Sequence, residues 1–154
     1  WRGPMLHKVL ELFFYNVLWD NDIEYIFIDL PPGTGDVALD IQSFIPQCEI
    51  IVVTTPHPTA SKIAVKAGFG AKQLNHEIIG VIENMSYYSD PENNNRVLIF
   101  GEGGGESVAK QLGVPLLGKL EIAQPKGKHH SLFGMDEPNG LEYLSIAKQI
   151  LQHK

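Results

Sequence analysis

The sequence of 154 residues has the length of a single domain and can bury a hydrophobic core. Hydrophobic residues make up 44% and charged residues 19%, a composition that excludes an intrinsically disordered chain. Eighteen acidic residues against 12 basic ones give a net charge of −6, so we expect neither a nucleic acid nor an anionic membrane as the main partner.

The sequence lacks the features expected of a secreted or membrane-spanning protein. Its single cysteine, Cys48, cannot form an internal disulfide, which is typical of a reducing compartment. No apolar run has membrane-spanning length, and the opening residues WRGPMLHK carry no signal-peptide pattern. These features predict a cytoplasmic protein.

The first predicted element is a helix over residues 4–19. Its apolar residues recur at helical spacing: Leu6, Val9, Leu10, Phe13, Phe14, Val17 and Leu18. So wide an apolar face needs a sheet to cover it, and the sequence opens without an initiator methionine. We therefore expect the sequence to be cut from a longer protein.

From residue 25 onward, apolar runs of strand length alternate with helical patterns. The predicted strands are YIFIDL (25–30), EIIVVTT (49–55), EIIGVIEN (77–84) and VPLLGKL (114–120), and the predicted helices cover 37–45, 59–74, 106–112 and 140–152. This order predicts an α/β fold with a mainly parallel sheet of at least four strands and helices on both faces. Ligands of such sheets bind beyond the carboxyl ends of the strands, so the loops after Asp29, Thr55 and Asn84 are expected at one edge.

Asp29 ends the first predicted strand and is followed by the loop PPGTGD (31–36). An aspartate at the end of a buried strand is costly unless its charge is satisfied, and in P-loop proteins Mg²⁺ satisfies it through bound water. The glycine amides of the loop could approach a γ-phosphate. The alternative is a plain strand-to-helix turn, in which Thr34 or Asp36 is the helix N-cap.

A phosphate-binding loop with the pattern G-x-x-x-x-G-K-[ST] is absent from the sequence. The stretch GVPLLGKL (113–120) matches through Lys119, but Leu120 replaces the hydroxyl and Pro115 removes a backbone amide. The stretch GEGGGE (101–106) carries two glutamates that would repel phosphate, so a turn that leads into a helix is the favoured interpretation.

Five motifs in order, FIDLPPGTGDV, VVTTPHPTA, GVIENMSYY, FGEGGGE and LGVPLLGKL, closely resemble the Mrp/ApbC family of P-loop ATPases, relatives of MinD, ParA and the nitrogenase iron protein. The resemblance covers essentially the whole chain and implies the P-loop NTPase fold. In that family a deviant Walker A loop lies upstream of the segment that WRGPM resembles. The resemblance therefore implies that residues 1–154 are the C-terminal portion of a single P-loop NTPase domain.

The resemblance also implies roles for individual residues. Asp29 corresponds to the Walker B aspartate that holds the water shell of Mg²⁺, and Asn84 to a residue at the adenine edge. The switch II loop, which senses the γ-phosphate, is implied to contain Pro32, Gly33 and Thr34, with Asp36 closing it as a second catalytic residue. ATP and Mg²⁺ are the implied cofactors of a slow, homodimeric ATPase, and whether this chain is itself an enzyme stays open. We expect it to bind ATP weakly and to self-associate.

Many family members carry a C-x-x-C pair just after the GVIENMSYY motif, where two subunits bridge an iron–sulfur cluster. Here the segment 87–100 contains no cysteine, and in this respect the chain resembles a Gram-positive branch of the family. The paired histidines His129 and His130 are interpreted as part of a solvated loop, so no iron–sulfur ligands are assigned. Two functions remain open: an iron–sulfur cluster carrier or assembly factor, and an ATP-dependent regulatory switch that binds a protein partner and no cluster.

Overall fold

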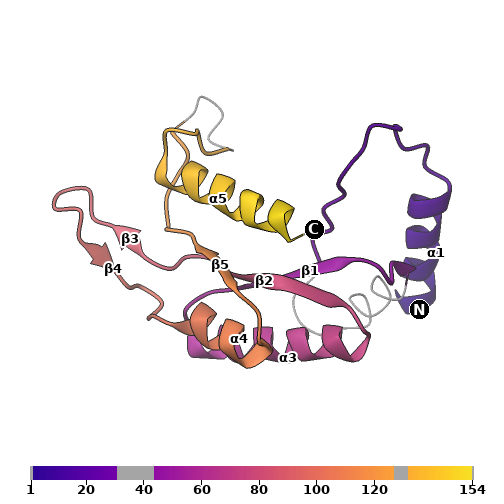
Figure 1. Cartoon of the computed structure of the whole chain (residues 1–154), viewed down its shortest axis with the longest axis horizontal. Coiled ribbons are helices and arrows are strands. Elements are labelled where there is room, and N and C mark those ends of the chain that lie inside the picture. The colour runs from indigo at the N-terminus through magenta and orange to yellow at the C-terminus, as the bar shows by residue number, and fades with distance from the viewer. Residues whose placement is uncertain (1, 31–43, 127–131, 154) are drawn as a thin grey trace.

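The centre of the molecule is a parallel sheet covered by helices on both faces (Figure 1). The computed structural model describes residues 2–30, 44–126 and 132–153. Its sheet has three strands in the order β1-β2-β5, with bounds β1 Glu49–Thr54, β2 Glu77–Glu83 and β5 Leu116–Lys119. The predicted α/β class is confirmed, and these strands begin and end within a few residues of their predicted positions.

Helices α3 and α4 lie on one face of the sheet, and α5 lies on the other (Figure 1). Their bounds are α3 Pro58–Gln73, α4 Gly104–Leu112 and α5 Pro138–Gln152. The side chain of His57 caps α3 by accepting a hydrogen bond from the Thr59 amide at 3.2 Å. The C-cap of helix α4 is Gly113, whose left-handed φ of 66° suits a glycine.

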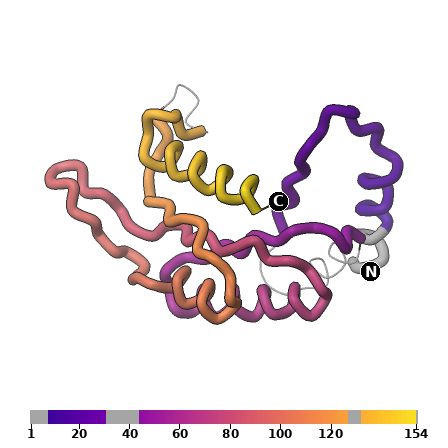
Figure 2. The backbone as a smooth tube through the Cα atoms, viewed as in Figure 1, coloured from indigo at the N-terminus to yellow at the C-terminus, as the bar shows by residue number. Residues whose placement is uncertain are grey.

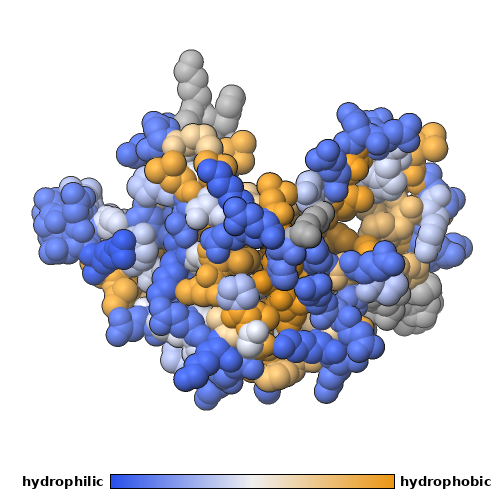
Figure 3. All heavy atoms as spheres, viewed as in Figure 1, coloured by the Kyte–Doolittle hydropathy of each residue, from blue (hydrophilic) through white to orange (hydrophobic). Residues whose placement is uncertain are grey.

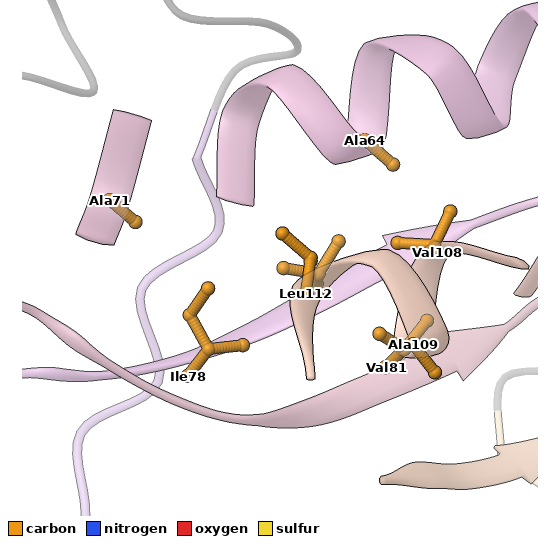
Figure 4. Close-up of a cluster of buried hydrophobic side chains, with 8 residues drawn as sticks. Ala64, Ala71, Ile78, Val81, Val108, Ala109 and Leu112 are labelled. Atoms are coloured by element: carbon orange, nitrogen blue, oxygen red, sulfur yellow. The ribbon is translucent and has the colours of Figure 1, made fainter. Parts of the chain in front are cut away.

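The larger of two hydrophobic clusters lies between the sheet and the α3–α4 layer (Figure 4). Its buried members are Val52, Ala64, Ala71, Ile78, Val81, Val108, Ala109 and Leu112. On the α5 face, Leu117, Leu120 and Ile146 form the smaller cluster. The continuous β-branched run of β2 therefore reflects burial on both faces of a parallel sheet, whereas β1 leaves Val53 exposed.

Helix α1, Arg2–Tyr15, and the segment 16–30 lie beside the sheet and not on it (Figures 1 and 2). The expected strand at 25–30 is wrong, because these residues adopt no strand structure. A strand forms only when a neighbour accepts its backbone hydrogen bonds, and within the described residues the run joins neither edge strand, β1 nor β5. Apolar side chains consequently stay exposed there, and Phe27 is 83% exposed.

A short antiparallel hairpin follows β2 and was not predicted. Its strands are β3 Tyr88–Ser89 and β4 Arg96–Val97. The turn between them is held by local bonds, in which the Asp90 carboxylate accepts from the Glu92 amide at 2.9 Å and the Asn93 side chain accepts from the Asn95 amide at 2.8 Å.

Two remaining expectations concern other parts of the chain. The helix expected at 37–45 falls almost wholly outside the described residues. Among the described helices, none combines the length and the apolar character that crossing a bilayer requires.

Candidate functional site

The three strands of the sheet end side by side, which defines its carboxyl edge. The last residues of the strands, Thr54, Glu83 and Lys119, are aligned by the parallel register of β1 with β2 and of β2 with β5. The loops that follow these residues meet at this edge, where parallel sheets bind their ligands.

Asn84 is the first residue beyond β2, and the structure fixes the orientation of its side chain. Its backbone N–H donates to the carbonyl of Thr54 at 2.8 Å, and its Oδ1 accepts from the amide of Met85 at 2.9 Å. Because the Met85 N–H must face an acceptor, the side-chain atom that it contacts is Oδ1, and the other terminal atom of the Asn84 amide is Nδ2. Within the described part of the chain, Asn84 Nδ2 donates to no partner, so two N–H donors are available to a ligand.

Glu83 lies beneath Asn84 and is 2% exposed. Its Oε1 accepts a hydrogen bond from the Ser86 hydroxyl at 2.7 Å, and its Oε2 accepts from the Gly105 amide at 2.5 Å. The second bond places a carboxylate at the N-terminus of α4, where the helix dipole favours negative charge. A buried carboxylate is tolerable only with such partners. Sequence reasoning missed Glu83, although a charge that ends a buried strand is the same signal that singled out Asp29.

The glycine cluster at 103–105 makes this arrangement possible. A Cβ on Gly104 would collide with the carbonyl oxygen of Pro56, and a Cβ on Gly105 would lie 2.6 Å from the Cβ of Glu83. Gly103, with a φ of 74°, is the N-cap of α4. The prediction that this stretch is a turn leading into a helix is confirmed, and the glycines let α4 approach both β2 and the loop after β1.

Lys119 ends β5 at the same edge. Its ammonium group is 2.8 Å from Oε1 of Glu106, and this hydrogen bond is the main cause that raises the pKa of Lys119. Burial opposes the rise, and the nearby charges of Glu83 and Glu102 add to it. The bond from Lys119 in turn lowers the pKa of Glu106. The stretch GVPLLGKL is thus a helix end followed by a strand, in agreement with the strand-like interpretation.

The segment after β5 connects this edge to the hairpin. The Ser86 amide donates to the Leu120 carbonyl at 2.8 Å, and the Ile122 amide donates to the Tyr87 carbonyl at 2.7 Å. Farther out, the Ser89 hydroxyl donates to the carboxylate of Glu121 at 2.6 Å. The turn that carries Asn84 is therefore bonded on both sides.

The other predicted site residues are not gathered here by the structure. Asp29 is exposed, in a segment without regular structure. Pro32, Gly33, Thr34 and Asp36 lie outside the described residues, as do His129 and His130. In the loop after β1, Pro56 is buried against Gly104, and Asn84 lies at the carboxyl edge as expected.

The only cysteine of the sequence lies at the opposite edge of the sheet. Cys48 precedes β1, and its Sγ is 3.4 Å from Nδ1 of the buried His76, which precedes β2. Six residues of β1 separate Cys48 from the carboxyl edge, a span of about 20 Å at the rise of a strand. The described residues include no group of three or more His, Cys, Asp or Glu that could hold a metal ion. An iron–sulfur cluster, which thiolates normally hold, does not fit this donor set.

A parallel sheet covered by helices on both faces, with loops gathered at its carboxyl edge, is the architecture of the α/β class to which P-loop nucleotide-binding proteins belong. The model of one such family, described as ParA and as NUBPL iron-transfer P-loop NTPase, matches residues 1–150. The chain belongs to this family, which confirms the resemblance in the sequence.

Similar proteins agree with this assignment. The chain is 47% identical over 154 residues to the iron-sulfur cluster carrier protein of Bacillus subtilis, covering 97% of this chain and 44% of that protein. It is 43% identical to the protein of the same name from Mycobacterium leprae, covering 96% of this chain and 41% of the relative. The chain thus spans under half the length of these curated relatives.

A solved structure is also similar. It is that of a nucleotide-binding protein from Archaeoglobus fulgidus in complex with ADP. The two share 25% sequence identity and superpose with a TM-score of 0.68, over 97% of this chain and 55% of that one.

Proposed function

We propose that the carboxyl edge of the sheet binds the base of an adenine nucleotide, with the Nδ2 of Asn84 donating to a ring nitrogen. The observation that carries this proposal is the fixed side chain of Asn84, whose Nδ2 points away from Met85 and has no partner among the described residues. The ADP complex of the similar Archaeoglobus fulgidus protein supports it.

Phosphate binding and hydrolysis are proposed for the whole protein and not for this chain alone. Asp29 would hold the water shell of Mg²⁺, while Pro32, Gly33 and Thr34 would sense the γ-phosphate with Asp36 closing the loop. The sequence contains no phosphate-loop pattern. We therefore assign phosphate binding to the part of the relatives' sequences that this chain does not match. In that setting we propose a slow, Mg²⁺-dependent ATPase that acts as a homodimer in the cytoplasm.

Two candidates remain for what the nucleotide controls. The names of the relatives support transport of an iron–sulfur cluster as cargo. The donor set of this chain supports the second candidate, a nucleotide-dependent switch whose surface binds a protein partner and no cluster. Its cysteine-free hairpin follows β2, whereas Cys48 precedes β1.

The base-binding proposal is tested by measuring the affinities for ADP and for GDP of the unmodified chain and of the Asn84→Ala variant. We expect the variant to lose about tenfold in ADP affinity, because a good hydrogen bond contributes about 1–1.5 kcal/mol. Gln73→Ala is the matched control, since Gln73 ends α3 beside the opposite edge of the sheet. Equal ADP affinity of Asn84→Ala and the unmodified chain would contradict the proposal.

The choice between carrier and switch is tested by anaerobic reconstitution with iron and sulfide. The switch predicts a colourless protein with less than about one iron per dimer. A stable brown species with stoichiometric iron and sulfide would favour the carrier and rule out the switch as stated.

A further inference from the structure

We propose that Glu83 is a positioning residue for nucleotide binding: it holds the turn that presents Asn84, and it joins that turn to the first residues of helix α4. This inference rests on the proposed function of Asn84. Glu83 itself is buried, and both of its carboxylate oxygens are bonded within the protein.

The first contact of Glu83 closes the turn. The Ser86 hydroxyl lies 2.7 Å from Oε1 of Glu83 and 3.0 Å from its carbonyl oxygen, so Glu83 and Ser86 bracket Asn84 and Met85. Met85 has a φ of 56°, a left-handed conformation that is unfavourable for a non-glycine residue and must be held by its surroundings. The Met85 N–H that donates to Asn84 Oδ1 belongs to the peptide group between Asn84 and Met85, which lies inside this bracket. Glu83 thereby fixes the direction of the Asn84 amide.

The second contact of Glu83 reaches another element. Its Oε2 accepts from the Gly105 amide at 2.5 Å, and the missing side chain of Gly105 lets the two backbones approach. Removal of the carboxylate would leave a buried N–H of α4 without its partner. The position of Asn84 is therefore coupled to α4 as well as to β2.

These contacts require two hydrogen-bonding atoms and not a negative charge. In Glu83→Gln, the amide oxygen can accept from Gly105 while the amide nitrogen donates to the Ser86 hydroxyl. That hydroxyl can still donate to the carbonyl of residue 83. Glu83→Gln should therefore preserve the turn, whereas Glu83→Ala removes both contacts. Ser86→Ala removes only the bracket around Asn84 and leaves the bond to Gly105.

The experiment follows the side-chain amide resonance of Asn84 by NMR in the ¹⁵N-labelled chain, without ligand and during titration with ADP. The resonance is assigned by its loss in Asn84→Ala. We expect Glu83→Gln to keep its position and to bind ADP within about threefold of the unmodified chain. Glu83→Ala and Ser86→Ala should move it towards the random-coil position and weaken ADP binding about tenfold. The matched control is Glu77→Ala, since Glu77 is an exposed glutamate at the other end of β2. It should change neither the Asn84 resonance nor the affinity for ADP.

The outcomes separate this inference from the proposed function. If Glu83→Ala does not fold, Ser86→Ala decides. An Asn84 resonance and an ADP affinity that are unchanged in Ser86→Ala would overturn the positioning role. If the unmodified chain binds no ADP, the base-binding proposal fails, yet the ligand-free resonance in Glu83→Gln and Ser86→Ala still decides whether Glu83 fixes Asn84.

Discussion

At the scale of single residues, Cys48 shows how local surroundings set chemistry. Burial raises the pKa of its thiol, and a backbone hydrogen bond opposes this only in part. Since the thiolate is the nucleophile, a raised pKa lowers the reactive fraction at neutral pH. Cys48 is therefore assigned a packing role beside His76 and not a redox or ligand role.

This assignment predicts slow alkylation. At pH 8, iodoacetamide should modify Cys48 several-fold more slowly than it modifies glutathione, and the rate should continue to rise above pH 9. Mass spectrometry over time measures both reactions, and alkylation in urea provides the control for a thiol freed from burial. A folded-state rate above that of glutathione would contradict the assignment.

The pair of Lys119 and Glu106 predicts a defined pH window. The folded-state pKa of Glu106 is lowered from 4.5, so its contribution to stability is present above that pH and is lost as the pH falls through the folded value. The pKa of Lys119 is raised from 10.5, so its contribution is present below that pH and is lost as the pH rises through the folded value. The effect is small, because the side chain of Glu106 is largely exposed to solvent.

Thermal unfolding of Glu106→Gln measures this window. The melting temperature should fall slightly below that of the unmodified chain at pH 7, and the difference should shrink as the pH falls below 4.5. The same difference should shrink at high salt, which screens exposed charges. A difference that persists unchanged at pH 3 would mean that the pair is not its cause.

At the scale of elements, α3 and α4 approach each other closely at Gly68. A Cβ on Gly68 would lie 2.5 Å from Cδ1 of Leu112, which is itself only 1% exposed. Overpacking of this kind costs about 1–3 kcal/mol, which exceeds the gain of up to about 1 kcal/mol from replacing a helical glycine by alanine. Gly68→Ala should therefore destabilise the chain.

A double-mutant cycle tests this contact. Chemical denaturation should show that Gly68→Ala costs about 1–2 kcal/mol alone and much less, or nothing, in a Leu112→Ala background, because the clash has been removed. Additive effects of the two substitutions would show that Leu112 is not what Gly68 accommodates.

The elements also show which features the sequence could predict. Strands β1, β2 and β5 and helices α3, α4 and α5 were predicted, because each carries its own apolar periodicity and turn residues. The run at 25–30 has the same composition, but a strand also needs a pairing neighbour, which local pattern does not reveal. The hairpin was missed because strands of two residues have no periodicity. Asn84 was placed at the carboxyl edge correctly, whereas the partnership of Glu83 with Gly105 joins residues 22 apart and depends on packing.

At the scale of the whole molecule, the segment 17–28 presents much apolar surface beside the sheet (Figure 3). Leu18 is fully exposed and Phe27 is 83% exposed. Several exposed large apolar side chains in one segment are typical of an interface. For this chain alone in solution, we expect a second copy of the chain to cover these side chains.

Self-association through this segment is the expected result. Sedimentation velocity should show concentration-dependent association of the unmodified chain, and Leu18→Lys with Phe27→Lys should reduce it. Leu132→Lys serves as the control, because Leu132 is similarly exposed but lies outside the segment. A monodisperse monomer at about 100 μM would show that this surface does not drive association, since even a weak interface of about −5.5 kcal/mol would be populated at that concentration.

We propose that this chain contributes the base-binding edge of a nucleotide site but not the loop that binds the phosphates. Charge-assisted hydrogen bonds contribute about 1.5–3 kcal/mol each, so a site without its phosphate loop loses several orders of magnitude in affinity. The decisive experiment is an NMR titration of the ¹⁵N-labelled chain with Mg-ATP that follows the side-chain amide of Asn84. We predict a saturable shift of that resonance with a dissociation constant weaker than about 10 μM, which corresponds to roughly −7 kcal/mol. An Asn84 resonance that does not respond, or a dissociation constant below about 10 μM, would contradict this division of the nucleotide site.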